Sequence, residues 1–371
     1  MDELKTKISH YLSEPYLLKE NFSDFEERMA SVPFFYENIN VELNNFDIAI
    51  LGIDNKNADN IRKHLFRLYK PQNIKIIDLG NLIADDNPEI NFLKISEIFK
   101  LLDSNDVKLV LLSDNEQNNI GLYQFFQKEQ VKFDALNIDS YVDFQSNENI
   151  TSTSYLNYFQ KNENLFSNFT ILGYQKYIVN SKVLKTVEEM DIKAFRLSQV
   201  ISEISEFEPI FRNSHLVSVD ISAVKASDAP ANEKNSPNGF DANQICLLSY
   251  FAGLSDNIKS FALHEISQKF DVNDITAKLG AQILWHFIDA FSTKIDVDKQ
   301  SNKNYRVYFI MFSENDSDFE LKFSHCLNTN RWWVEVINLE NNKLWPCTNM
   351  DYEQAKIKKL SPRLRSYLSN K

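Results

Sequence analysis

The chain has 371 residues, and its 40 basic and 52 acidic side chains give a formal net charge of −12. This acidic balance argues against nucleic acid as a partner, because a phosphate backbone is bound by a basic surface. No apolar run approaches the roughly 20 residues that a membrane span needs, and residues 1–20 are charged and contain no apolar signal region, so the sequence predicts a cytoplasmic protein without a membrane span.

The counts of glycine, cysteine and histidine exclude several kinds of site. The seven glycines are too far apart for a glycine-rich nucleotide-binding loop or for the G-x-S-x-G turn of an α/β-hydrolase. Cys246, Cys326 and Cys347 are too scattered for a disulfide framework or a C-x-x-C metal site. The six histidines show no H-x-H or H-E-x-x-H spacing, so no histidine-based metal motif is visible.

Strand and helix patterns alternate along most of the chain. Residues 1–45 are expected to be helical and irregular, whereas FDIAILGI at 46–53 is an almost continuous apolar run, typical of a strand buried on both faces of a parallel sheet. Further strands are expected at 74–82, 107–114, 133–139, 169–175, 215–222 and 258–266, and helices at 57–69, 89–104, 120–129, 184–191, 241–254 and 275–291. This alternation predicts an α/β fold, a three-layer α/β/α sandwich around a mostly parallel sheet.

The pattern changes after about residue 295. A polar linker at 295–304 precedes three expected antiparallel strands at 306–312, 318–326 and 331–339, and the chain closes with a short basic tail. We therefore expect an N-terminal helical segment (1–45), an α/β domain (46–295) and a β-rich C-terminal appendage (296–371) packed on that domain. Trp332 and Trp333 alternate sides of the last strand, so either both pack or one is exposed as a protein contact.

Acidic residues stand at the ends of three expected strands. Asp139 and Asp143 follow the strand at 133–139, Asp220 lies near the end of the strand at 215–222, and Glu265 ends the strand at 258–266. Ligands of parallel sheets bind at the carboxyl ends of the strands, which makes these residues the first candidates for a site. The alternative is that Asp139 and Asp143 are only solvated acids at a strand end.

Three segments together resemble the ureohydrolase superfamily, which includes arginase, agmatinase and formimidoylglutamase. They are IDSYVDF (138–144), SVDISAVKASDAP (218–230) and LHEI (263–266), and weaker matches in the same order extend the resemblance over residues 45–292. The sequence is most similar to the formimidoylglutamase-like branch found in Bacteroidota. The resemblance implies an arginase-like fold, although a fold alone does not establish a function.

The resemblance also implies where the family's metal ligands fall. In the family, six ligands hold two Mn²⁺ ions, which generate the hydroxide that attacks a guanidinium or amidine carbon. In chain order these ligands match Glu116 (or Asn115, if the register shifts by one), Asp139, Tyr141, Asp143, Asp220 and Ser222. Two histidines have therefore become Glu116 and Tyr141, and a bridging aspartate has become Ser222. Glu265 matches the family's substrate-facing glutamate, and of the histidines only His215 and His264 lie near enough to the expected cleft to be tested as replacement ligands.

These replacements lead to three hypotheses. The first is that the protein has lost bimetallic hydrolysis, binds no metal cofactor and serves as a binding or assembly component, with a protein partner or as a homo-oligomer. The alternative is an active formimidoylglutamase-like hydrolase that uses Mn²⁺ to cleave a C–N bond of a linear amidine or guanidino compound. The second alternative is a small-molecule sensor whose vestigial pocket binds its ligand through Glu265.

Overall fold

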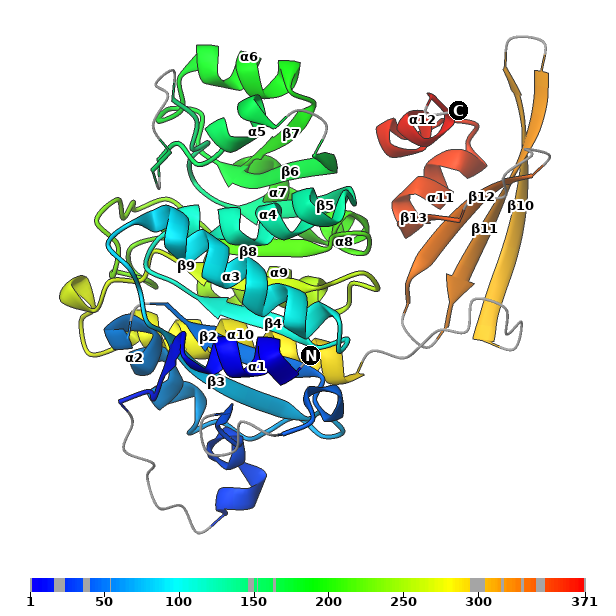
Figure 1. Cartoon of the computed structure of the whole chain (residues 1–371). Helices are drawn as coiled ribbons and strands as arrows, with labels where there is room; N and C mark the ends of the chain where they lie inside the picture. Colours follow the sequence, from blue (N-terminus) through cyan, green and yellow to red (C-terminus); the bar gives the residue numbers. More distant parts are fainter. Residues whose placement is uncertain are drawn as a thin grey trace. The chain divides into compact units, whose positions relative to one another are not determined.

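The computed structural model describes residues 2–369 except 17–23, 36–40, 54, 146–149, 152, 163–164, 294–303, 315–316, 328–329 and 338–343. The chain forms two compact units (Figure 1). The larger comprises Met1–Ile204 and Asn213–Lys294, and the smaller comprises Ser205–Arg212 and Ile295–Lys371. Among the described residues, no helix is both long enough and apolar enough to cross a membrane.

The larger unit is built on a nine-stranded sheet in the order β1-β3-β2-β4-β9-β8-β5-β6-β7. The strands are β1 (Leu12–Ser13), β2 (Ile48–Gly52), β3 (Ile76–Leu82), β4 (Lys108–Leu112), β5 (Phe133–Ile138), β6 (Phe166–Tyr174), β7 (Ile192–Arg196), β8 (Leu216–Asp220) and β9 (Ser260–His264). All neighbouring strands are parallel except β1 and β3, which are antiparallel. The mostly parallel sheet predicted from the apolar runs is thus confirmed.

Helices cover both faces of this sheet. They are α1 (Asp2–Ser9), α2 (Asn55–Leu65), α3 (Pro88–Asp103), α4 (Asn119–Glu129), α5 (Asn157–Lys161), α6 (Ser181–Glu189), α7 (Leu197–Ser202), α9 (Ala242–Gly253) and α10 (Ile275–Thr293). Neighbouring residues of β9 show the two faces: Ala262 belongs to the core that includes residues of α3 and α4, whereas the ring of Phe261 stacks on that of Phe287 in α10 with centroids 4.5 Å apart. Because successive side chains of a strand point to opposite faces, these contacts define the three layers of the sandwich.

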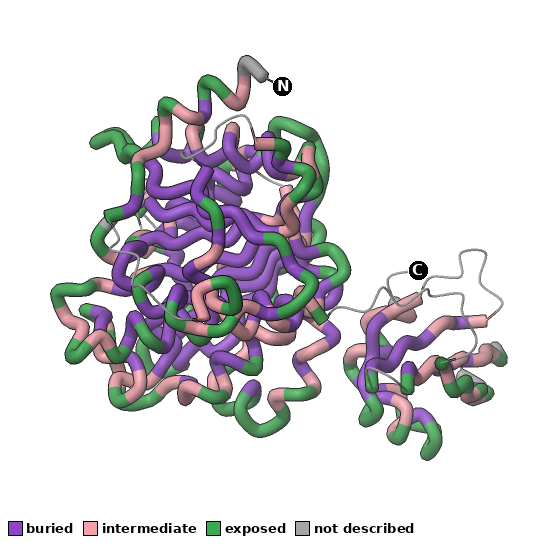
Figure 2. Tube along the Cα trace, turned by 90° about the horizontal axis from the view of Figure 1, so that it is seen from below, coloured by how far each residue is buried: buried purple, intermediate pink, exposed green. Residues whose placement is uncertain are grey.

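The sheet lies at the centre of the larger unit, where buried residues gather (Figure 2). Every residue of β2, β3, β8 and β9 is buried, as expected for strands covered on both faces. In Figure 1, α1 and α3 lie in front of the sheet and α10 lies behind it. The short strand β1 lies within the segment that the sequence assigned to helical and irregular structure, and it adds an antiparallel edge to the sheet.

The smaller unit contains a four-stranded antiparallel sheet in the order β10-β11-β12-β13. Its elements are β10 (Tyr305–Glu314), β11 (Ser317–Cys326), β12 (Trp332–Ile337), β13 (Trp345–Cys347), α11 (Asn349–Lys356) and α12 (Pro362–Ser369). Trp332 and Trp333 are both buried, with 6% and 4% of their surface exposed, so the reading in which one is an exposed contact is wrong. Most of the expected linker at 295–304 lies outside the described residues.

An internal segment, Ser205–Arg212, belongs to the smaller unit although it precedes β8 in sequence. It includes the short helix α8 (Glu208–Phe211). The guanidinium group of Arg212 donates a 2.5 Å hydrogen bond to the carbonyl of Trp332 and lies 4.8 Å from the ring centroid of Trp333. Glu208 forms an ion pair with Arg331 at 3.3 Å. The chain therefore enters the smaller unit twice, which the sequence pattern did not predict.

Candidate functional site

Four acidic residues converge at the carboxyl ends of the central strands. Asp139 directly follows β5, and Asp143 lies in the loop after it. Asp220 is the last residue of β8, and Glu116 begins a short 3-10 helix, η5 (Glu116–Asn118), that follows β4. β5 pairs with β8, and β9 lies between β8 and β4. The parallel sheet therefore delivers all four side chains to one edge.

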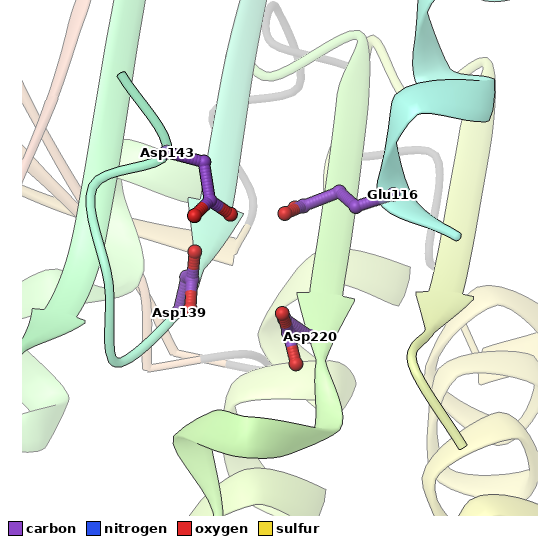
Figure 3. A group of neighbouring side chains, drawn as sticks. All are labelled: Glu116, Asp139, Asp143 and Asp220. Atoms are coloured by element: carbon purple, nitrogen blue, oxygen red, sulfur yellow. The ribbon is translucent and has the colours of Figure 1, made fainter. Parts of the chain in front are cut away.

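The four carboxylates form a compact, buried group. One carboxylate oxygen from each of Glu116, Asp139, Asp143 and Asp220 lies within 4.8 Å of the others. Figure 3 shows the side chains pointing toward one another from separate elements. Their exposed fractions are between 0% and 4%. The alternative that Asp139 and Asp143 are solvated acids is therefore wrong.

The residues at the replaced family positions orient the acidic group. The backbone N–H of Tyr141 donates to Oδ1 of Asp139 at 2.9 Å. The Ser222 hydroxyl donates to the same oxygen at 3.3 Å, and the Ser222 backbone N–H donates to Oδ1 of Asp220 at 2.6 Å. The Ser222 hydroxyl also contacts the hydroxyl of Ser140 at 3.0 Å. Tyr141 and Ser222 thus hold two of the carboxylates in place.

Several oxygens of the group have no donor. Both Oε atoms of Glu116, Oδ2 of Asp139 and Oδ2 of Asp143 are buried and receive no N–H or hydroxyl hydrogen bond from any described residue. Buried polar atoms in proteins are almost always satisfied, so four buried carboxylate oxygens of one group without a donor fit a cationic or protonic partner.

Burial raises the pKa of every carboxyl group in the cluster, and for Glu116, Asp139 and Asp143 repulsion between the carboxylates adds to it. Burial is the largest cause of the raised pKa of Glu116 and of Asp139, and repulsion from the neighbouring carboxylates adds to it. The pKa of Asp143 rises to about 6, again chiefly through burial, and that of Asp220 is raised by burial as well. The group therefore binds protons more tightly than ordinary carboxylates and requires positive charge to stay ionised.

Glu265 lies beside the group in a strained backbone conformation. Its φ angle is +64°, a left-handed value that is uncommon for a residue other than glycine. Its backbone N–H donates to the carbonyl of Ser113, and its Oε1 accepts a 3.4 Å hydrogen bond from the backbone N–H of Glu116. Burial, and then the charge of Asp220, raise its pKa to about 8. Strain of this kind concentrates at functional sites, which agrees with the expected placement of Glu265 at the cleft.

Lys234 is the site residue that the sequence analysis missed. Its Nζ is buried, has no hydrogen-bond partner among the described residues, and lies 5.2 Å from the ring centroid of Tyr141. Burial alone would lower the pKa of Lys234, but Asp143, Asp220 and Glu265 raise it above its ordinary value. Lys225 lies in the same stretch of sequence and pairs with Asp228 at 3.5 Å. Sequence alone offers no signal that tells which of the two lysines faces the carboxylates.

Neither candidate histidine belongs to the group. His215 precedes β8, at the end of the strand opposite to Asp220, and its Nδ1 accepts a hydrogen bond from the backbone N–H of Asp134. Nε2 of His264 contacts Oδ1 of Asn119 at 2.9 Å, and burial lowers the pKa of His264 to about 3. Neither of the two histidines that were candidates for a replacement ligand therefore joins the acidic group.

The donor set fits one hard divalent cation. Four carboxylates supply only oxygen, which suits Mn²⁺, Mg²⁺ or Ca²⁺, and the described part of the chain adds no imidazole or thiolate to this group. The Ser222 hydroxyl is neutral and already bonded to Asp139 and Ser140, so it does not replace a carboxylate that bridges two ions. The residues that would hold a single cation are Glu116, Asp139, Asp143 and Asp220.

Comparisons with known proteins agree with this fold. Residues 52–289 match the model of the arginase family. A comparison with curated proteins finds no match. Among solved structures, formimidoylglutamase from Bacillus subtilis is similar with a TM-score of 0.66 and 14% identity, covering 78% of this chain and 99% of that one.

Two further structures share the fold. The Trypanosoma cruzi formiminoglutamase with Mn²⁺ has a TM-score of 0.63 and 17% identity, covering 68% of this chain and 96% of that one. The agmatine ureohydrolase of Thermoplasma volcanium has a TM-score of 0.58 and 17% identity, covering 68% and 92%. At these identities the likeness shows the fold alone, but the family match spans more than half of the sequence. The chain belongs to the arginase family.

Proposed function

We propose that this arginase-family protein has lost two-metal hydrolysis and serves as a binding or assembly component, with an acidic site that accepts at most one divalent cation. The observation that carries the proposal is the composition of the cluster, in which four carboxylates converge without any imidazole. Two cations in close contact need several shared anionic ligands to offset their repulsion. Ser222 brings a neutral hydroxyl where the family resemblance calls for a bridging carboxylate.

The surroundings of Tyr141 support the same proposal. This residue stands where the resemblance calls for a histidine ligand, and its ring lies against the ammonium group of Lys234. An imidazole lone pair is therefore replaced by an aromatic face and a neighbouring positive charge. That charge repels a second cation in a buried site, where electrostatic interactions are strong.

Glu265 favours a second candidate function, a one-metal hydrolase of linear amidines or guanidino compounds. A carboxyl group with a pKa of about 8 exchanges protons near neutral pH, as general acid–base catalysis requires. A divalent cation, when bound, would supply a more acidic water molecule. The substrate class follows from the names of the structural neighbours, two formimidoylglutamases and an agmatine ureohydrolase.

Metal content and turnover, measured on the same preparation, distinguish the two candidates. The full chain is purified without chelator, its metal content is determined by mass spectrometry, and hydrolysis of formimidoylglutamate, agmatine and arginine is followed with added Mn²⁺. We expect at most one metal ion per chain and no manganese-dependent turnover. Two tightly bound Mn²⁺ ions would contradict the loss of the two-metal site, and turnover that Asp220→Asn abolishes would establish a hydrolase instead.

Reversion of the replaced ligands gives a positive test. The triple variant Glu116→His, Tyr141→His and Ser222→Asp restores the ligand types that the resemblance implies. Because metal ligands act as a unit, we expect the triple variant to raise Mn²⁺ affinity by more than any single reversion, measured by calorimetry. Light scattering on the unaltered chain tests assembly. A homo-oligomer would support assembly of the chain with itself, and a monomer would leave a partner protein for that role.

A further inference from the structure

The ammonium group of Lys234 is placed where a buried anionic group needs compensation. Its Nζ is shielded from solvent and makes no hydrogen bond with any described residue, although a lysine ammonium carries three donors. The nearest defined contact is the face of the Tyr141 ring, 5.2 Å from Nζ to the centroid. A buried cation without partners is costly unless nearby negative charge stabilises it.

That negative charge comes from the acidic group. Burial lowers the pKa of Lys234, but the nearby carboxylates together raise it by more. They are Asp143, Asp220, Glu265 and Asp139. In return, the charge of Lys234 opposes the upward pKa shifts of Asp139 and Asp143. The lysine and the carboxylates therefore stabilise one another's charged forms across the site, without a direct ion pair among the described residues.

The loop that carries Lys234 is tied to the site. The backbone N–H of Lys234 donates to Oδ1 of Asn232 at 2.6 Å, and Nδ2 of Asn232 donates to the carbonyl of Glu265 at 3.0 Å. The backbone N–H of Ser267 also donates to the carbonyl of Ala231. These bonds hold the backbone at the base of the lysine against the segment that carries Glu265.

We propose that Lys234 is a built-in counter-ion that competes with a divalent cation for the four carboxylates, so that it stabilises the metal-free protein and weakens metal binding. This inference rests on the proposed function, because it concerns the same acidic site. Because Lys234 belongs to the same chain, its ammonium group is always present near the carboxylates at a high effective concentration. A free cation must overcome its repulsion to bind.

The test compares Lys234→Met, which keeps the length of the side chain but removes its charge, with Lys234→Arg and with Lys225→Met as a matched control from the same stretch. Calorimetric titration with Mn²⁺ and thermal unfolding in EDTA are measured on each full-length protein. For Lys234→Met we expect Mn²⁺ affinity at least about tenfold above that of the unaltered chain, since a unit charge that is shielded from solvent acts strongly on a buried site. We also expect a lower melting temperature in EDTA that Mn²⁺ restores.

The two other variants should behave differently. Lys234→Arg keeps the charge, and Lys225→Met changes only a partly exposed ion pair, so both should bind Mn²⁺ within about threefold of the unaltered chain. The proposal would be overturned if Lys234→Met bound Mn²⁺ no more tightly than the unaltered chain, or if neither protein bound Mn²⁺. The affinity ratio is independent of turnover and metal number, so a failure of the proposed function would be seen separately.

A second measurement covers the case in which Lys234→Met does not fold. Side-chain ¹⁵N labelling of lysine in the unaltered protein allows Mg²⁺, a diamagnetic probe, to be titrated by NMR. We expect the Nζ resonance of Lys234 to shift as Mg²⁺ fills the acidic group, while that of Lys225 stays in place. An Nζ resonance of Lys234 that stays unchanged up to millimolar Mg²⁺ would overturn the proposal.

Discussion

Glu116 is completely buried, and neither of its carboxylate oxygens meets an N–H or hydroxyl donor from the described residues. An ionised carboxylate in this position would lose its hydration without compensation, which costs several kcal/mol. Protonation, a bound cation or the nearby ammonium group each removes part of that cost. The charge of this single side chain therefore affects which ions the site accepts.

His264 allows a pH test outside the acidic group. Burial lowers its pKa to about 3, whereas an ordinary histidine has a pKa of 6.5. Between these values the unfolded chain binds a proton that the folded chain does not, so the stabilising contribution is present above pH 6.5 and is lost as the pH falls toward 3. We expect His264→Gln to remove up to about 1.4 kcal/mol per pH unit from the pH dependence of unfolding in this range.

Urea unfolding at a series of pH values measures this difference. The matched control is His10→Gln, because His10 is exposed and lies outside the core. Its free energy of unfolding should follow that of the unaltered chain at every pH. Parallel curves for His264→Gln and the unaltered chain would contradict the assignment of a buried neutral imidazole.

At the scale of elements, the packing of α9 against α10 depends on the absence of a side chain at one position. A Cβ atom at Gly253 would lie 2.2 Å from the carbonyl oxygen of Phe287 and 2.7 Å from Cβ of Ala290, both in α10. Helix α10 also packs against α2, so it has little freedom to move away. Close contact between backbones therefore requires glycine here.

We expect Gly253→Ala to lower the free energy of unfolding by about 1–3 kcal/mol, because backbone and packed side chains must shift to make room. Gly280→Ala in α10 is the matched control. Its Cβ atom would approach only flexible side-chain ends, 3.2 Å from Ile266 and 3.3 Å from Leu263, and alanine favours a helix by up to about 1 kcal/mol. Urea denaturation of both variants checks the prediction, and a Gly253→Ala protein as stable as Gly280→Ala would refute it.

In the molecule as a whole, the chain passes between its two units more than once. The segment Ser205–Arg212 belongs to the smaller unit, and the chain then returns to form β8 of the larger one. Arg212 is 3% exposed, with its guanidinium group bonded to β12 and stacked on Trp333. Removal of the C-terminal residues would leave this segment without its partners.

A chain that ends at Thr293 should therefore melt at a lower temperature and be less soluble than the full protein. The matched full-length variant, Arg212→Met, removes only the buried guanidinium group, so that Glu208 loses one of its cationic partners. We expect this variant to lower the free energy of unfolding by about 2–4 kcal/mol. Calorimetry and solubility measurements on both proteins test this. A shortened chain with unchanged melting temperature and solubility would show that Ser205–Arg212 does not depend on the C-terminal residues of the smaller unit.

The class of fold, the family and most residues of the acidic site could be predicted from the sequence. Continuous apolar runs such as 46–53 are long enough for buried strands and too short for buried helices, and their alternation with amphipathic segments leaves a parallel sheet as the main solution. Asp139, Asp143 and Asp220 could be placed at one edge because the carboxyl ends of parallel strands meet there. These conclusions depend on local patterns, which sequence carries directly.

Which side chains complete the site could be seen only in the folded chain. It resolves the choice between Glu116 and Asn115, since Glu116 enters the acidic group while the Asn115 side chain caps the following turn. It also brings Lys234 to the carboxylates, adds β1 to the sheet and assigns 205–212 to the smaller unit. Each of these outcomes depends on contacts between residues far apart in the chain. A local pattern of residue types does not predict the energies of such contacts.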